Sequence, residues 1–378
     1  MTRILTYHDI DQQQWRFLIN QSPTATWFQT PEAYAFYASL PEEMTPFAVG
    51  VVEECKASQW AHPSSDLKVL NDLKDGSTDR LAGVIVGYIT REKNPMKQFF
   101  TRRAIIVGGP LLADDISDEA LSALLKAAAQ FKVESLKCKG KATSEAVTSA
   151  LTPYTLHPTP IYIESRNFHD YSRWKYTFEQ NGFAYQPHYD IHVYCNAQHQ
   201  MSERRQRELK RAIKNGATVA EAQTEQEIRT WYQILQKLYR EKVRTPLFSE
   251  EFFLQFYRNG VGKYLLVKAD DKVIGGMMCP ILDGKAIYEW YVCGLDEEYR
   301  ELSPSVVATH AAIECAKTNG LPLFDFMGAG QPDVPYGVRD FKLEFGGELV
   351  EYGRFLCIRK PLLYWLGNLG VKLLKMKR

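Results

Sequence analysis

The 378-residue sequence lacks the features that mark secreted, disulfide-bonded or membrane-spanning proteins. Its seven cysteines are an odd number and none forms a C-x-x-C pair, which argues against a disulfide framework or a structural zinc site. No stretch reaches the roughly 18 apolar residues that a membrane span needs. The first residues, MTRILTYHDIDQQQ, are too polar for a secretory signal. We therefore expect a cytoplasmic protein.

The sequence also lacks an excess of charge of either sign, because 46 basic residues face 45 acidic ones. Attraction for an anionic partner must therefore come from local clusters. A hydrophobic content of 45% and a charged content of 24% describe an ordinary globular protein. The length favours two domains over one.

The second half contains the clearest pattern, three runs rich in β-branched and aromatic residues that predict an antiparallel meander. Asp-Asp and Asp-Gly pairs between the runs indicate the turns. A helix with Ser303 as its N-cap and Gly320 as its stop follows, and then a short strand, Pro322–Met327. The three runs are Gly262–Ala269, Lys272–Leu282 and Lys285–Leu295.

The first half repeats this order, with a long connection Cys55–Asp79 and an insertion Val133–Thr159. Helices, a meander and a β-α-β crossover resemble the GNAT acyltransferase fold, in which two parallel strands splay apart and leave a cleft. An internal repeat of this kind predicts an α/β protein of two tandem GNAT-like domains, with Ala286–Cys293 and Pro322–Met327 as splayed strands. The repeated elements are strands Thr45–Glu54, Arg80–Ile89 and Arg102–Leu112, helix Asp118–Lys132 and strand Pro160–Ser165.

The segments DFMGAG (325–330) and YGVRDFKLEFGG (336–347) resemble the C-terminal signature of the FemA/FemB-type (FemABX) aminoacyltransferases, which build peptidoglycan cross-bridges. Four other stretches also resemble segments of that family and occur in the same order along the chain: IIVGGPLL, IESRNFHDYS, RRQRELKRAIKNG and YREKVRTPLFS. The resemblance implies a first domain of residues 1–165 completed by 348–378, and a second, 166–347, with the active-site cleft. It also implies transfer of an aminoacyl group from an aminoacyl-tRNA to an amine of a lipid- or nucleotide-linked muramyl peptide, without a cofactor.

Two residues are the predicted catalytic groups. Lys342 matches the lysine of the family's F-K-x-x-F-G motif, which implies donor binding and transition-state stabilisation. An ordinary lysine is a cation at neutral pH, so it suits an electrophilic role and not that of a base. Glu289 is the only charged residue of its strand, and a carboxylate there can accept the proton that an acceptor amine must lose. The alternatives are a surface ion pair for Lys342 and a structural carboxylate for Glu289.

The glycine-rich loop before Lys342 supplies the predicted substrate-binding residues. Arg339 follows three glycines and two prolines, and with Lys342 it can meet a phosphate or carboxylate. Asp325 and Gly328 match the family's D-x-x-G, in which the aspartate either orients a basic residue or caps the turn. We expect the following loop residues at the site: Asp325, Gly328, Tyr336, Gly337 and Arg339.

A basic helix is predicted over Glu203–Lys214, with six Lys or Arg residues among twelve and with Leu209 and Ile213 as a narrow apolar stripe. Such a run is usually a solvated face. It can also grip the phosphates of tRNA or of a nucleotide-linked precursor. The residues expected to do so are Arg207, Arg211 and Lys214.

Three further segments decide which cofactors and partners are expected. Acyl-CoA-dependent GNAT enzymes bind the pyrophosphate of coenzyme A in a glycine-rich loop before the main helix. The corresponding segment here, DEEYRELSPSV (296–306), has no glycine and four acidic residues, and the segment GGPLLADDIS of the first half does not match the loop pattern either. Both segments argue against binding of coenzyme A. HYDIH puts His188, Asp190 and His192 on one face of an ordinary strand, and no metal site is expected there. The tail RKPLLYWLGNLGVKLLKMKR either packs on the first domain or lies on the inner face of the membrane.

Two other functions stay open at this point. One is an acyl-CoA-dependent N-acyltransferase of envelope or polysaccharide metabolism. The other is a catalytically silent protein that binds an anionic envelope precursor.

Overall fold

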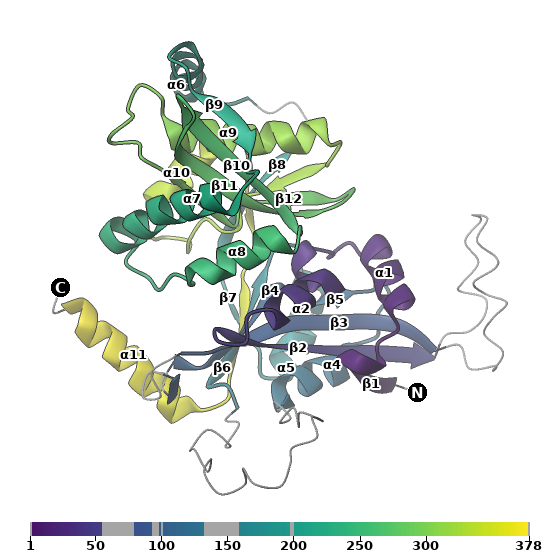
Figure 1. Cartoon of the computed structure of the whole chain (residues 1–378). Coiled ribbons are helices and arrows are strands. Elements are labelled where there is room, and N and C mark those ends of the chain that lie inside the picture. Colours follow the sequence, from purple (N-terminus) through teal and green to yellow (C-terminus); the bar gives the residue numbers. More distant parts are fainter. Residues whose placement is uncertain are drawn as a thin grey trace, which may run out of the picture.

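The structure is a computed structural model of the chain, and it describes residues 2–54, 79–92, 98–99, 101–131, 159–196 and 200–376 (Figure 1). The greater part of the predicted connection and of the predicted insertion, residues 55–78 and 133–158, lies outside these ranges. The described strands form two mixed sheets of eight strands each.

The first sheet has the order β1-β2-β3-β4-β6-β16-β7, with β5 paired to β3. Strands β2 and β3 are buried along nearly their whole length because helices cover the sheet, which explains their continuous valine and isoleucine runs. The strands are β1 Thr2–Thr6, β2 Met44–Glu54, β3 Asp79–Thr90, β4 Arg103–Gly108, β5 Leu111–Leu112, β6 Tyr162–Asn167, β7 Ala184–Gln186 and β16 Arg354–Ile358. The helices are α1 Gln12–Gln21, α2 Pro31–Ala38, α4 Asp118–Gln130 and α5 Lys175–Gln180.

The second sheet has the order β15-β8-β14-β12-β11-β10-β9, with β13 paired to β11. Helix α9 packs on β10 and β11, and α7 packs on β11 and β13. The strands are β8 Tyr189–Tyr194, β9 Thr218–Glu221, β10 Gly262–Ala269, β11 Lys272–Leu282, β12 Ala286–Tyr288, β13 Tyr291–Gly294, β14 Leu323–Asp325 and β15 Glu348–Glu351. The helices are α6 Glu203–Lys214, α7 Glu225–Leu238, α8 Glu250–Arg258, α9 Pro304–Thr318 and α10 Gly337–Leu343.

The third strand of the predicted meander is interrupted. Instead of one strand over Lys285–Leu295, β12 and β13 pair with different parts of β11 and are separated by Glu289 and Trp290. The N–H of Glu289 donates to Asp325 O at 2.9 Å, whereas that of Trp290 donates to Met278 O on the opposite side at 3.1 Å. The parallel pairing of β12 with β14 ends at Tyr288↔Asp325. Glu289 therefore lies where the two strands part.

The corresponding parallel pair of the first sheet does not open in this way. Strands β4 and β6 are paired over six positions, from Arg103↔Tyr162 to Gly108↔Asn167, against three positions for β12 and β14. The splay between neighbouring parallel strands is thus a feature of the second sheet.

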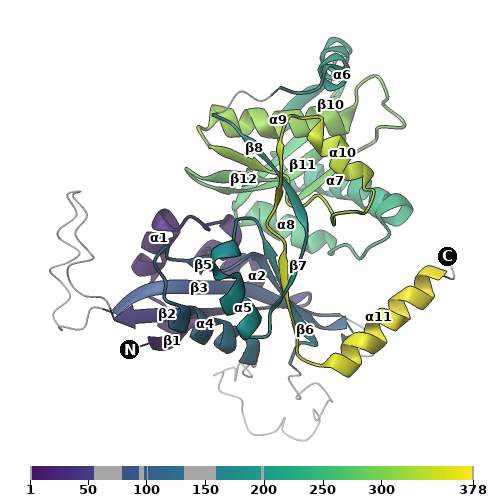
Figure 2. The same ribbon diagram turned by 180° about the vertical axis from the view of Figure 1, so that it is seen from behind.

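The chain passes between the sheets twice, and the two passages run side by side (Figure 2). The N–H of Gly353 on one passage donates to His188 O on the other at 3.1 Å. Strand β7 pairs with β16 in the first sheet, and β15 pairs with β8 in the second. The strand pairing therefore places β7 and β15 on the other side of the predicted boundaries at 165/166 and 347/348.

Aromatic side chains join the two halves of the molecule. Phe28 lies 5.0 Å from Trp290 and Phe36 lies 5.2 Å from Phe252, measured between ring centroids. Three of these rings are fully buried and Trp290 packs against them, so the first and second sheets share one apolar core. Edge-to-face contacts of this kind add to the stabilisation from burial alone.

Helix α11, Pro361–Met376, extends away from both sheets (Figure 1). Tyr364 near its start contacts Tyr162 of the first sheet, with ring centroids 5.2 Å apart. Several of its apolar side chains are exposed: Leu362, Trp365, Leu366 and Leu369. Among the described residues, no helix combines the length and apolar character needed to cross a bilayer.

Candidate active site

A cavity of about 1590 Å³ lies between the two sheets. Its walls combine aromatic, basic and acidic side chains, as is usual for a ligand site that is apolar with a few convergent polar groups. The first sheet contributes Tyr88, Arg103 and Arg166, and the second domain contributes Asp190, Glu289, Trp290, Tyr336 and Lys342. The splay of the second sheet therefore opens toward the first sheet.

Glu289 and Lys342, the two predicted catalytic residues, form a buried ion pair in this cavity. Glu289 Oε1 lies 3.1 Å from Lys342 Nζ. The ammonium group also donates to Phe326 O at 2.6 Å and to Gly328 O at 3.0 Å. Three acceptors thus match the three protons of Lys342. Direct contact of Lys342 with a substrate anion would require one of them to be displaced.

The second carboxylate oxygen of Glu289 is available for chemistry. Glu289 Oε2 is buried and has no hydrogen-bond partner within the described part of the chain. Burial raises the pKa of Glu289, and the nearby Lys342 only partly opposes this effect. A carboxylate held by one oxygen, with the other free and a pKa above its usual range, is suited to accept a proton.

The Arg339 side chain donates hydrogen bonds to backbone carbonyl groups of the glycine-rich loop. Its Nε donates to Ala329 O at 2.7 Å and its Nη2 donates to Val334 O at 3.2 Å, while the guanidinium lies over the Tyr189 ring. The predicted capture of an anion by Arg339 would require it to leave these carbonyl groups. Tyr336 borders the cavity and is 42% exposed, whereas the exposed Gly337 begins α10.

Asp325 caps the turn that follows β14. Its Oδ1 accepts from the N–H of Met327 at 2.6 Å, and its Oδ2 lies 3.5 Å from His192 Nε2. Both roles considered for Asp325 are therefore present, with His192 as the basic neighbour. Gly328 borders the cavity and has a φ of +111°, and its N–H donates to Asp190 Oδ1 at 2.7 Å. Positive φ explains why glycine stands there.

The three predicted phosphate-gripping residues are exposed on α6, at the far end of the second domain (Figure 1). Arg207 lies 3.8 Å from Glu203, and Arg211 lies 3.2 Å from Glu301. Neither these two residues nor Lys214 borders the cavity. Any contact that they make with a phosphate is therefore remote from Glu289.

The apolar stripe predicted for α6 is wrong in one position. Ile213 is 59% exposed, whereas Leu209 and Ala212 are buried. The buried edge also contains Arg205, whose guanidinium lies 2.6 Å from Glu344 and over the Phe341 ring. A charged residue that is buried with its partner explains why the sequence did not show this edge.

An arginine wall, formed by Arg103, Arg166 and Arg354, lines the first-sheet side of the cavity and was not predicted. Arg354 lies 2.6 Å and Arg166 lies 3.1 Å from the same carboxylate, Glu164. Burial alone would raise the pKa of Glu164, but the two guanidinium groups lower it to about 2. Two cations against one carboxylate leave positive charge in the wall. The available signal was a single arginine in each of the strands β4, β6 and β16.

The helix N-termini at which coenzyme A would place its diphosphate already hold carboxylates of the chain. At α9, the N–H of Ser305 donates to Asp296 Oδ1 at 3.0 Å. At α4, the N–H of Ser117 donates to Glu53 Oε1 at 3.2 Å. A helix N-terminus attracts anions through its free N–H groups and its dipole, so a diphosphate bound at either end would compete with a carboxylate of the chain.

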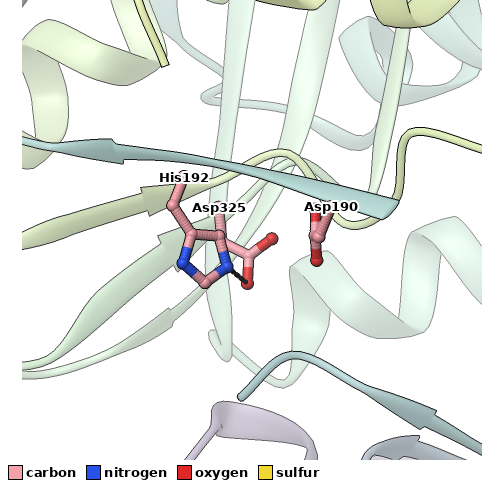
Figure 3. Close-up of side chains that lie close together, drawn as sticks. All are labelled: Asp190, His192 and Asp325. Carbon is pink, nitrogen blue, oxygen red and sulfur yellow. Dashed lines mark ion pairs between the residues drawn. The ribbon is translucent and has the colours of Figure 1, made fainter. Parts of the chain in front are cut away.

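The histidine-rich strand forms a different set from the one considered in the sequence. His188 contacts Arg354, with 2.9 Å between Nε2 and Nη2, and is not part of the set. Asp190 and His192 instead meet Asp325 of the neighbouring strand (Figure 3). The side chains of all three are at most 3% exposed.

Comparisons with known proteins agree with this architecture. Residues 201–342 match the family described as Acetyltransferase (GNAT) domain. The crystal structure of FemX has a TM-score of 0.62 at 14% identity, over 96% of this chain and 99% of that chain. L-PGS from Bacillus licheniformis has a TM-score of 0.50 at 11% identity, over 95% and 96%. No curated protein sequence matches the chain.

Residues 201–342 are a GNAT-type acyltransferase domain by this match, and the predicted fold of two tandem GNAT-like units is confirmed. The predicted resemblance to the FemA/FemB-type family is confirmed in the fold, over nearly the full length of both chains. The domain match contains every residue predicted for the site, from Arg207 to Lys342.

Proposed function

We propose that this protein transfers an aminoacyl group from an aminoacyl-tRNA to an amine of a lipid- or nucleotide-linked muramyl peptide. The observation that carries the proposal is the free oxygen of Glu289, which stands at the splay of a GNAT-type cleft that faces the arginine wall. The likeness of the fold to FemX supports the same substrate class.

In the proposed reaction, the acceptor amine attacks the carbonyl carbon of the aminoacyl ester. Glu289 Oε2 takes a proton from the amine as the amide bond forms, and the proton then passes to the tRNA hydroxyl oxygen as the ester bond breaks. Lys342 keeps the carboxylate in position through Oε1. Lys342 is therefore proposed as a positioning residue in the resting site.

The arginine wall is the proposed contact for the acceptor. A muramyl peptide carries carboxylates, and its nucleotide or lipid carrier carries phosphates. Guanidinium groups bind both through charge-assisted, often bidentate hydrogen bonds. Because Arg166 and Arg354 share the single carboxylate Glu164, they retain capacity for such an anion.

An aminoacyl-tRNA is favoured over acyl-CoA because of the two occupied helix N-termini. Asp296 at α9 and Glu53 at α4 would repel a diphosphate and compete with it for N–H groups. In this proposal, the exposed basic residues of α6 meet the tRNA backbone at a distance from the reacting atoms. They are Arg207, Arg211 and Lys214.

Helix α11 is the proposed contact with the inner face of the membrane. The side chains of Leu362, Trp365, Leu366 and Leu369 follow helical i, i+3, i+4, i+7 spacing and are 38–69% exposed. The segment 352–378 contains basic residues and no acidic one. An apolar helix face next to positive charge fits an anionic lipid surface, from which a lipid-linked acceptor would be presented.

Calorimetric titration tests the substrate class. We expect the purified protein to bind a UDP-linked muramyl pentapeptide and to show no heat of binding with acetyl-CoA. A charged-tRNA assay with this acceptor should then yield a peptide extended by one amino acid. Binding of acetyl-CoA alone would overturn the proposal in favour of an acyl-CoA-dependent enzyme. Binding of the muramyl peptide without transfer from any aminoacyl-tRNA would favour the silent binder.

A further inference from the structure

We propose that Asp190, His192 and Asp325 form a binding site for one divalent transition-metal cation, with Zn²⁺ the best fit. Neither the GNAT-type reaction nor the cleft residues Glu289 and Lys342 require such a site. The inference therefore stands apart from the proposed function, and its test does not depend on catalytic activity.

The fold brings the three side chains together from two adjacent strands. Asp190 and His192 alternate along β8 and so share one face of the sheet. Asp325 of β14 is the register partner of His192. One ligand atom from each residue lies within 4.8 Å of the other two. In Figure 3 the Asp325 carboxylate lies between the imidazole ring of His192 and the side chain of Asp190.

Three polar atoms of this set are buried without hydrogen-bond partners, counted over the described residues. They are Asp190 Oδ2, His192 Nε2 and Asp325 Oδ2, of which the last two make only the 3.5 Å ion pair with each other. Buried polar atoms are normally satisfied, so three neighbouring exceptions need an explanation. A cation between them would satisfy all three atoms at once.

The other carboxylate oxygens are already fixed by the backbone. Asp190 Oδ1 accepts from the N–H groups of Ile191 and Gly328, both at 2.7 Å. Asp325 Oδ1 accepts from the N–H of Met327 at 2.6 Å. Outer hydrogen bonds of this kind orient the ligands of known metal sites. Here they leave one oxygen of each carboxylate for the cation.

The charge of the set also calls for a cation. Two buried carboxylates face one imidazole, and the nearby ammonium group of Lys342 is already paired with Glu289 at 3.1 Å. A divalent ion would balance the two carboxylates and leave a neutral imidazole as the third ligand. Imidazole and carboxylate together suit Zn²⁺, whereas Mg²⁺ prefers an octahedral shell of oxygen atoms.

The cavity gives the site a route to solvent. Asp190 and Gly328 both border it. Three protein ligands leave at least one coordination position of Zn²⁺ for water or another small ligand. A cation here would also cross-link β8 to β14 at the edge of the splay.

Metal binding to the full-length protein tests the site directly. After chelator treatment and dialysis, we expect one equivalent of Zn²⁺ to bind in calorimetry, and one equivalent of Co²⁺ to give visible absorption bands typical of four- or five-coordination. The variants His192→Gln and Asp325→Asn should weaken Zn²⁺ affinity by about 100-fold or more, because loss of an outer-shell partner alone costs 10–100-fold. His188→Gln, on the same passage of chain but outside the set, is the matched control and should bind as the wild type does.

Two outcomes would overturn the site. One is the absence of stoichiometric binding and of Co²⁺ bands in the wild-type protein. The other is binding that His192→Gln leaves unchanged. Asp325→Asn removes a turn-capping carboxylate and can prevent folding, so a second measurement uses the wild-type protein alone. Zn²⁺ should then raise the unfolding temperature of the wild type, and no rise would count against the proposal.

Discussion

Glu289 Oε1 and Lys342 Nζ lie 3.1 Å apart, although 53 positions separate the two residues in the sequence. Glu289 stands at the break between β12 and β13, and Lys342 stands on α10. The ion pair therefore ties the glycine-rich loop and its helix to the splay of the sheet. It leaves the other carboxylate oxygen of Glu289 buried and without a hydrogen-bond partner among the described residues.

Replacing Glu289 by glutamine tests its proposed role as the base. We expect Glu289→Gln to lower the rate of aminoacyl transfer by about 10²–10⁴-fold, the usual contribution of a general base. Affinity for the UDP-linked muramyl pentapeptide should stay near the wild-type value, because the arginine wall is intact. Transfer rates and calorimetry measure the two effects. Glu298→Gln, at an exposed ion pair with Lys237, is the control, and normal turnover in Glu289→Gln would refute the assignment.

The ion pair should also show in stability. Lys342→Met leaves the buried Glu289 carboxylate without its cation, which should lower the free energy of unfolding on the order of 3–5 kcal/mol. The double variant Lys342→Met with Glu289→Gln should recover part of this loss, since no unpaired charge remains. Urea unfolding of the four proteins measures the coupling. Strictly additive losses would mean that the two side chains do not interact in solution.

Glu164 should make stability depend on pH in the acid range. Its pKa is about 2 in the folded protein, below the ordinary glutamate value of about 4.3. A lowered folded-state pKa stabilises the fold above about pH 4.3, and this contribution is lost as the pH falls toward 2. Urea unfolding at several pH values should show a difference between wild type and Glu164→Gln that is constant near neutrality and shrinks below about pH 4.3. A difference that does not shrink would contradict the shift.

The parts of the fold and of the candidate site that could be predicted are those whose interacting residues lie close together in the sequence. The bounds of β10 and β11 were predicted correctly, because local alternation and turn residues define them. The break at Glu289 was not, since it depends on partners in β11 and β14. The arginine wall and the partnership of His192 with Asp325 were missed for the same reason. Pairing between strands that are remote in sequence cannot be predicted from a single sequence.

The arginine wall should govern affinity for the acceptor. Arg166→Gln should weaken binding of the UDP-linked muramyl pentapeptide by about 10–100-fold, because a hydrogen bond to a charged group contributes about 1.5–3 kcal/mol. Calorimetry at two salt concentrations measures this and should show a weaker salt dependence in the variant. Arg173→Gln, at an exposed pair with Asp114, should bind normally. Unchanged affinity in Arg166→Gln would place the anions of the acceptor elsewhere.

Helix α11 should bind anionic membranes through its exposed apolar face. We expect the protein to sediment with phosphatidylglycerol vesicles and much less with phosphatidylcholine vesicles. Replacing both Leu362 and Trp365 by serine should reduce binding at least tenfold, since each buried methylene group contributes about 0.8 kcal/mol. Tyr176→Ser, which removes an exposed aromatic ring from α5, is the control. Equal sedimentation of wild type and double variant would rule out this face.

The position of β16 has a consequence for biosynthesis. This strand, Arg354–Ile358, lies between β6 and β7 in the first sheet, although more than 150 residues separate it from both. During translation β6 and β7 remain without their partner strand until β16 is made, whereas β8 to β14 of the second sheet are complete about 30 residues earlier. The later-made half would thus mature first. A ribosome-stalled chain ending before residue 354 should expose β6 to proteases and chaperones.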